Sequence, residues 1–160
     1  MIKNTNEISL NFRELSNSLE LMERVIYKGN NSFRHIKFFD AFKQTYRQVN
    51  RCFMKSKLQE LLTTALKQLP DDDSTDLHPR SKLKLESLLT KIDEVLESHA
   101  RIKMGPMKRM VKEASMILDV RHHVAFCQVS LGVMGEINKR TTDIVNLLKS
   151  YQVVVRQAIS

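Results

Sequence analysis

The sequence has few of the residues that form turns: four glycines and three prolines among 160 residues. An all-β domain needs many turn residues, so this scarcity excludes one. With 42% hydrophobic and 28% charged residues, the composition is typical of an all-helical protein, and the length suits a single domain with its own core. No uncharged apolar run approaches the roughly 18 residues that a membrane span requires. We therefore expect no membrane partner.

Enzyme and metal motifs are also missing. The sequence has no glycine-rich phosphate loop and no GxSxG-type motif, and its five histidines show no metal-ligand spacing with Cys52 or Cys127. We therefore expect no catalytic residue, no metal and no cofactor. Without a secretory leader, both cysteines are expected to be reduced thiols of a nuclear or cytosolic protein. His99 falls among apolar residues, where a hydrogen-bonded core histidine is a better interpretation than a general base.

Apolar residues recur every three or four positions along most of the chain, which is the pattern of helices that bury one face. The pattern predicts an all-α antiparallel bundle of four to six helices, with long first, second, fourth and last helices, in one domain spanning residues 1–160. The expected helices cover residues 6–28, 32–55, 56–69, 81–104 and 107–118, with a last stretch that ends near 158.

Glycine, asparagine and proline mark the expected helix ends. Residues 29–31 are Gly-Asn-Asn and favour the left-handed conformation that ends a helix, while Gly105-Pro106 is expected to end the fourth helix sharply. Residues 119–123 are either a turn or a kink. The acidic segment 70–80 is the expected linker, and its aspartates fit no calcium-binding loop.

Most of the positive charge lies in one segment, residues 28–57. It holds eight lysine or arginine residues and one acid, a local charge of +7 within a net +8 for the chain, together with five of the seven phenylalanines. Nucleic-acid phosphate is the commonest partner of such a surface, because lysine and arginine displace its counterions. Charge runs are also often solvated faces, so both interpretations stay open. The phenylalanines have helical spacing, and we expect them to be core rather than a base-stacking platform.

Two groups of basic residues are the candidate RNA contacts. In the first, a stripe recurs every four residues along the expected second helix, and further charge lies at that helix's start, where unpaired backbone N–H groups favour phosphate. The second group surrounds Gly105-Pro106 and contains no acid. The stripe is Lys43, Arg47 and Arg51; the helix-start residues are Arg34, His35 and Lys37; the second group is Arg101, Lys103, Lys108, Arg109 and Lys112.

Short motifs in both halves of the chain occur together in a known family. The first half contains Tyr27, Asn31-x-x-Arg34, Phe38-Phe39-x-x-Phe42 and Lys43-Gln44; the second contains Phe126, Leu131, Gly135 and Lys139-Arg140. Over about residues 20–150, this set resembles the helical N-terminal domain of the nucleolus and neural progenitor protein and the small RNase MRP-specific protein of yeasts. The chain departs from the family in having no tryptophan and no lysine-rich C-terminal tail, so we expect the bundle itself to supply any RNA contacts.

The resemblance implies a non-catalytic subunit of RNase MRP, the ribonucleoprotein that cleaves precursor ribosomal RNA, and hence a protein of the nucleus and nucleolus. The implied partners are a structured RNA like that of RNase MRP and other RNase P/MRP protein subunits. Carried over from the family, Asn31 and Arg34 would lie at the connection between the first two helices, with Arg34 clamping a phosphate. Lys139 or Arg140 would match the basic position that follows the glycine of the late helix.

Two other functions are compatible with a basic helical bundle. One is a helical protein–protein adaptor that docks a partner helix and makes no direct RNA contact. The other is a basic protein of the membrane surface, which is disfavoured because the aromatic residues lie on bundle seams instead of one exposed face. A salt titration of RNA binding separates the RNA-binding hypothesis from the adaptor.

Overall fold

The computed structural model describes residues 5–67, 79–119 and 123–159, and every regular element among them is helical. The prediction of an all-α bundle is therefore confirmed. The elements are α1 (Thr5–Phe33), α2 (Lys37–Val49), the π-helical turn η1 (Asn50–Met54), α3 (Leu58–Leu66), α4 (Pro79–Ile102), the π-helical turn η2 (Lys103–Met107), α5 (Lys108–Asp119) and α6 (Val124–Ile159).

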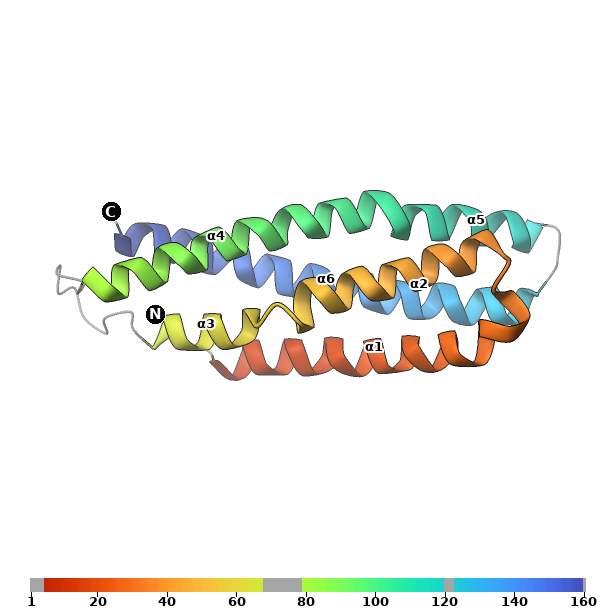
Figure 1. Cartoon of the computed structure of the whole chain (residues 1–160), viewed down its shortest axis with the longest axis horizontal. Helices are drawn as coiled ribbons and strands as arrows, with labels where there is room; N and C mark the ends of the chain where they lie inside the picture. The colour runs from red at the N-terminus through yellow and green to blue at the C-terminus, as the bar shows by residue number, and fades with distance from the viewer. Residues whose placement is uncertain (1–4, 68–78, 120–122, 160) are drawn as a thin grey trace.

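Four antiparallel rods form the bundle (Figure 1). The first rod is α1; the second is α2, η1 and α3 end to end; the third is α4, η2 and α5; and the fourth is α6, a helix of 36 residues. Each rod packs against the two that flank it, so that α1 contacts α2 and α6 while α5 contacts α2 and α6. None of the described helices is both long and apolar enough to cross a membrane.

The core is built from the helical seams that the sequence predicts. Four phenylalanines of the basic segment are completely or almost completely buried, as expected for core residues. Each such burial stabilises the fold by about 1.5–3 kcal/mol. The buried seam includes Ile8, Phe12, Leu15, Leu19 and Met22 on α1; Phe38, Phe39, Phe42 and Val49 on α2; Phe53 on η1; Leu85, Leu88, Ile92 and Val95 on α4; Met110 on α5; and Ile137, Ile144, Leu148 and Val155 on α6.

The first helix does not end at residues 29–31, as its glycine and asparagines suggest, but continues to Phe33. Gly29 is buried beneath aromatic rings from other elements. A Cβ atom here would lie 2.5 Å from Cζ of Phe126 and 3.0 Å from Cε2 of Phe39. The glycine is therefore explained by the close approach of these rings to the backbone of α1, and not by a helix end.

The second rod also differs from its predicted bounds. α2 begins at Lys37, after Ile36, so Ser32 lies inside α1 instead of capping the second helix. At the other end, the α-helix widens into η1, and Lys57, with a φ of 54°, separates η1 from α3. α3 therefore begins at Leu58, later than its predicted start at residue 56.

Gly105 and Pro106 do not end the fourth predicted helix. The chain passes through them in η2 and continues directly into α5, so that α4, η2 and α5 form one rod (Figure 1). In an α-helix, a proline ring collides with the carbonyl four residues before it. A π-helical turn is wider by one residue and makes room for the ring. Pro106 is accordingly buried in the bundle.

Two predicted features fall on residues outside those described. The acidic linker was predicted at 70–80, and 70–78 are not described; Pro79 and Arg80 belong to α4. The choice between a turn and a kink at 119–123 depends on 120–122, which are also outside the described residues.

Candidate nucleic-acid interface

An aromatic cluster holds the connection between α1 and α2 in place. Phe33, in the last turn of α1, stacks on Phe126 of α6 with ring centroids 3.9 Å apart and an interplanar angle of 12°. The ring of His123 meets Phe33 edge-on at 5.0 Å, and Phe39 of α2 lies 5.9 Å from Phe126. Since three rods contribute rings, the basic residues that follow Phe33 project from a rigid support.

The turn after α1 brings three predicted contacts together. Arg34 and His35 form the turn and Lys37 begins α2, and all three side chains are exposed. The Nε atom of Arg34 donates a hydrogen bond to Nε2 of His35 over 2.9 Å. The three residues line a hollow of about 240 Å³, which we call the turn hollow. Arg34 is thus oriented by its neighbour, and its guanidinium stays accessible to a phosphate.

Arg109, from the second predicted group, lines the same hollow but is already engaged. Its Nη2 atom donates a hydrogen bond to Oε1 of Gln44 over 2.8 Å and lies 3.4 Å from Oδ2 of Asp40. Both charged side chains are about half exposed, so the pair stabilises the bundle by at most about 1 kcal/mol. Its main effect is to tie α5 to α2 and to offset Asp40, one of the two acids that line the turn hollow; the other is Glu113.

A second hollow, the α1–α2 groove, lies beside the last turns of α1. Three predicted contacts line it, Asn31, Lys43 and Arg47, and its volume is about 590 Å³. The ammonium of Lys43 lies 5.1 Å from the ring centroid of Phe39, a cation–π contact that holds its charge at the groove. The remaining lining residues are Glu23, Ile26, Tyr27, Lys28 and Asn30.

The charge of the α1–α2 groove is positive on balance. Lys28, Lys43 and Arg47 line it together with one acid, Glu23. Glu23 lies beside the hydroxyl of Tyr46, whose pKa is raised by burial and then by this carboxylate. Glu23 is itself exposed and lines the groove, so three cations against one acid leave the lining with a net charge of +2.

Tyr27 is a residue of this groove that the sequence did not single out as a contact. Its side chain is 85% exposed, in contrast to the buried phenylalanines of the same segment. An exposed aromatic ring beside cations is the arrangement on which nucleic-acid bases stack. The sequence does contain one signal for this exposure: Tyr27 directly follows Ile26 of the α1 seam, and neighbouring residues on a helix point in different directions.

The structure separates Arg51 from Lys43 and Arg47. Residues four apart on an α-helix are rotated by about 40°, so a row of three slants around the helix. Arg51 also lies on η1 and lines a different hollow, of about 450 Å³, together with Lys91 and Arg101 of the third rod. The predicted stripe is therefore divided between two hollows.

Lys108 and Lys112 lie elsewhere on the bundle. They line a groove between α5 and α6, the rods opposite the α1–α2 groove. Lys139 is exposed on α6 but does not line that groove. The structure therefore does not bring these lysines together with Asn31, Lys43 and Arg47.

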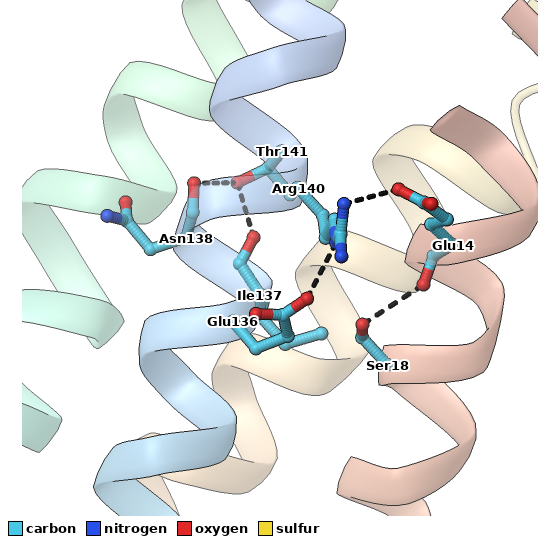
Figure 2. A network of polar contacts seen from close by, with 7 residues as sticks. All are labelled: Glu14, Ser18, Glu136, Ile137, Asn138, Arg140 and Thr141. Atoms are coloured by element: carbon cyan, nitrogen blue, oxygen red, sulfur yellow. Dashed lines mark hydrogen bonds and ion pairs between the residues drawn. The ribbon is translucent and has the colours of Figure 1, made fainter. Parts of the chain in front are cut away.

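Arg140 serves the bundle itself and not an open surface. Its guanidinium bridges Glu14 of α1 and Glu136 of its own helix, with the Nε atom 2.6 Å from Oε1 of Glu136 (Figure 2). The hydrogen bond from Arg140 to Glu136 raises the pKa of Arg140, and its side chain is only 24% exposed. With both carboxylates in place, Arg140 has little capacity left for a phosphate.

The buried nucleophilic and basic side chains are held neutral. Burial, and then the charges of Lys103 and Lys149, lower the pKa of His99, and burial raises the pKa of Cys52 to about 11. His99 is in the core as predicted, but its Nε2 atom has no hydrogen-bond partner among the described residues. Within the described ranges, no three His, Cys, Asp or Glu side chains converge as metal ligands would.

Comparison with known proteins identifies the family. The family model for the N-terminal domain of nucleolus and neural progenitor protein matches residues 1–154 of the 160-residue chain. No curated protein and no solved structure matches it. A family of this description indicates a nucleolar role. The chain, matched over nearly its whole length, belongs to the nucleolus and neural progenitor protein family.

Proposed function

We propose that this bundle is a non-catalytic RNA-binding subunit of an RNase MRP-like nucleolar ribonucleoprotein that acts in precursor ribosomal RNA processing. The observation that carries the proposal is the α1–α2 groove, which Lys28, Lys43 and Arg47 line together with the exposed Tyr27. Sites for single-stranded nucleic acid combine two components: cations that displace the counterions of the phosphates, and an aromatic ring on which a base stacks. The family assignment supports the nucleolar part of the proposal.

The roles of the residues follow from their positions. Lys43 and Arg47 bind phosphates along the groove, Arg34 holds a further phosphate at the turn hollow, and Tyr27 stacks on an unpaired base. Asn31, which lines the groove with them, supplies a neutral hydrogen-bonding amide. Such contacts position a structured RNA at one of its unpaired segments and carry little base specificity. The chemistry of cleavage belongs to the RNA, and the other RNase P/MRP proteins are the expected neighbours.

A salt titration tests the groove. For the Lys28→Ala/Lys43→Ala/Arg47→Ala variant, we expect weaker binding to a single-stranded RNA and a slope of log K against log salt that is shallower by about two, since each lost contact contributes roughly 0.7. The matched control is Arg13→Ala/Lys82→Ala/Lys84→Ala, which removes the same charge from exposed positions outside the groove. Equal slopes for the two variants would contradict the assignment.

Tyr27 offers a test that is independent of charge. Replacing Tyr27 with alanine should weaken RNA binding by about 1–3 kcal/mol without changing the salt slope, because a stacked base is lost and no counterion contact is. Tyr27→Phe keeps the ring and should bind like the wild type. If Tyr27→Phe were as weak as Tyr27→Ala, stacking would not be the role of this residue.

The place in a particle is tested by purifying the endogenous protein. We expect an RNase MRP-like RNA and RNase P/MRP subunits to copurify, and the triple groove variant to lose the RNA. Recovery with unrelated proteins and without RNA would favour the adaptor instead. One feature supports that second candidate: a largely apolar hollow of about 1020 Å³ between α1 and α6, with Leu21 49% and Val129 53% exposed.

A further inference from the structure

The groove between α5 and α6, which we call the α5–α6 groove, has a positive rim. Its volume is about 460 Å³, and Lys103, Lys108 and Lys112 line it along the third rod. No acidic residue within the described ranges lines it, in contrast to the α1–α2 groove and the turn hollow. Three lysines without a carboxylate favour an occupant that carries acidic groups.

The floor of the same groove is apolar. Met107 and Met134 are buried beneath it, Leu131 is half-buried, and Val111 is 46% exposed. Methionine side chains are flexible and polarizable, and they are common where a surface packs against a partner. Phosphate and ribose find no hydrogen-bond donor on such a floor, whereas apolar side chains of a protein do pack there. The floor therefore distinguishes this groove from the RNA surface.

Gly135 leaves space in the groove that no other part of the described chain fills. It lies in the middle of α6, where glycine is the poorest helix former apart from proline. Unlike Gly29, Gly135 is not explained by a close contact with the described part of the chain, because a Cβ atom there would meet nothing within 4 Å. A side chain here would project into the groove and obstruct an occupant.

Asn138 supplies a polar group one turn further along α6. Its side chain points away from the ion pairs of Arg140, on the other side of the helix (Figure 2). Its Oδ1 atom is buried and has no donor among the described residues. Because Oδ1 is shielded from solvent, a partner's donor reaches it only when the carboxamide turns outward, and that contact would relieve the cost of an unsatisfied acceptor.

We propose that the α5–α6 groove docks an acidic amphipathic helix of a partner protein. Apolar side chains at spacings of three and four fill the space above Gly135 and Val111, while flanking glutamates or aspartates meet the three lysines. The carboxamide of Asn138 anchors one end. This assigns Lys108 and Lys112 to a protein partner and leaves RNA to the opposite side of the bundle.

A selection from a helical peptide library tests this. The library carries apolar residues at positions i, i+4 and i+7, with flanking positions randomised among glutamate, glutamine and lysine, and is displayed against the full chain. We expect the selected peptides to be enriched in glutamate. Their affinity should fall about tenfold for Gly135→Leu, which fills the groove, and about tenfold for Lys108→Glu/Lys112→Glu, which reverses its charge.

The matched control is Gly132→Leu. Gly132 is also an exposed glycine of α6, and a Cβ atom added to it would meet nothing within 4 Å, but it does not line the groove, so affinity should be unchanged. Circular dichroism checks that all variants remain helical.

Two results would overturn the proposal: selected peptides without glutamate enrichment, or equal peptide affinity for Gly135→Leu and Gly132→Leu. The proposal would also be overturned if a single-stranded RNA displaced the peptide and Gly135→Leu blocked the binding of that RNA. Loss of RNA binding in the α1–α2 groove variant is measured separately and leaves this outcome unaffected.

Discussion

Replacing Gly29 with alanine should destabilise the bundle, although alanine is the better helix former. The added Cβ would lie 2.5 Å from Cζ of Phe126, about 1 Å closer than an ordinary carbon–carbon contact. Phe126 cannot retreat freely, because it stacks on Phe33 at 3.9 Å and packs near Phe39 at 5.9 Å. Overpacking of this kind costs about 1–3 kcal/mol, and helix propensity returns about 1 kcal/mol. We therefore expect a net loss of about 1 kcal/mol.

Gly132 provides the matched control for this prediction. A Cβ at Gly132 meets nothing within 4 Å, so Gly132→Ala should raise the free energy of unfolding by up to about 1 kcal/mol. Urea unfolding followed by the helical circular dichroism signal measures both variants. For a chain of this length, each 1 kcal/mol corresponds to about 2–4 °C in Tm. The two alanine variants should therefore move in opposite directions.

A double variant examines the cause. If the loss comes from the contact with Phe126, Gly29→Ala in a Phe126→Leu background should cost less than in the wild type, with a coupling energy of about 0.5 kcal/mol or more. Additive effects would show that the ring is not responsible. Equal stability of Gly29→Ala and Gly132→Ala would refute the reasoning altogether, because helix propensity alone would then explain both.

The other predictions concern the ion pairs and the buried titratable groups. Arg140→Met should lower the urea midpoint, because Glu14 and Glu136 lose the cation that they share. The variant should leave the salt slope of RNA binding unchanged, and a shallower slope would show that Arg140 does contact RNA. Burial lowers the pKa of His99, so the unfolded state binds a proton at this residue more readily than the folded state. The free energy of unfolding should therefore fall as the pH drops below the ordinary pKa of histidine. His99→Leu should flatten this part of the profile of urea midpoint against pH, and an unchanged profile would contradict the prediction. Burial raises the pKa of Cys52 to about 11 and also raises the pKa of Cys127. Both thiols should therefore resist alkylation by iodoacetamide at about pH 8 until urea unfolds the chain. Rapid labelling of the native protein would contradict this prediction.

Much of the fold follows from local pattern. The seam residues of α1, α2, α4 and α6 are buried where their three-and-four spacing places them, because a helix repeats every 3.6 residues wherever it forms. The helix ends were less predictable. At Gly29 and at Gly105-Pro106, local preferences of about 1–3 kcal/mol compete with burial of whole aromatic and apolar side chains, and burial decides.

The candidate site, too, was predictable from the sequence only in part. From the sequence alone, residues 28–57 could be recognised as a positive segment whose phenylalanines are core, because charge and helical spacing are read along one chain. The packed bundle was needed to show that Tyr27 is exposed beside Lys43 and Arg47, that acids already bind Arg109 and Arg140, and that Lys108 and Lys112 line another groove. Partners such as Glu14 and Arg140 are 126 positions apart in the chain, so their contact depends on how the rods pack and not on any local pattern.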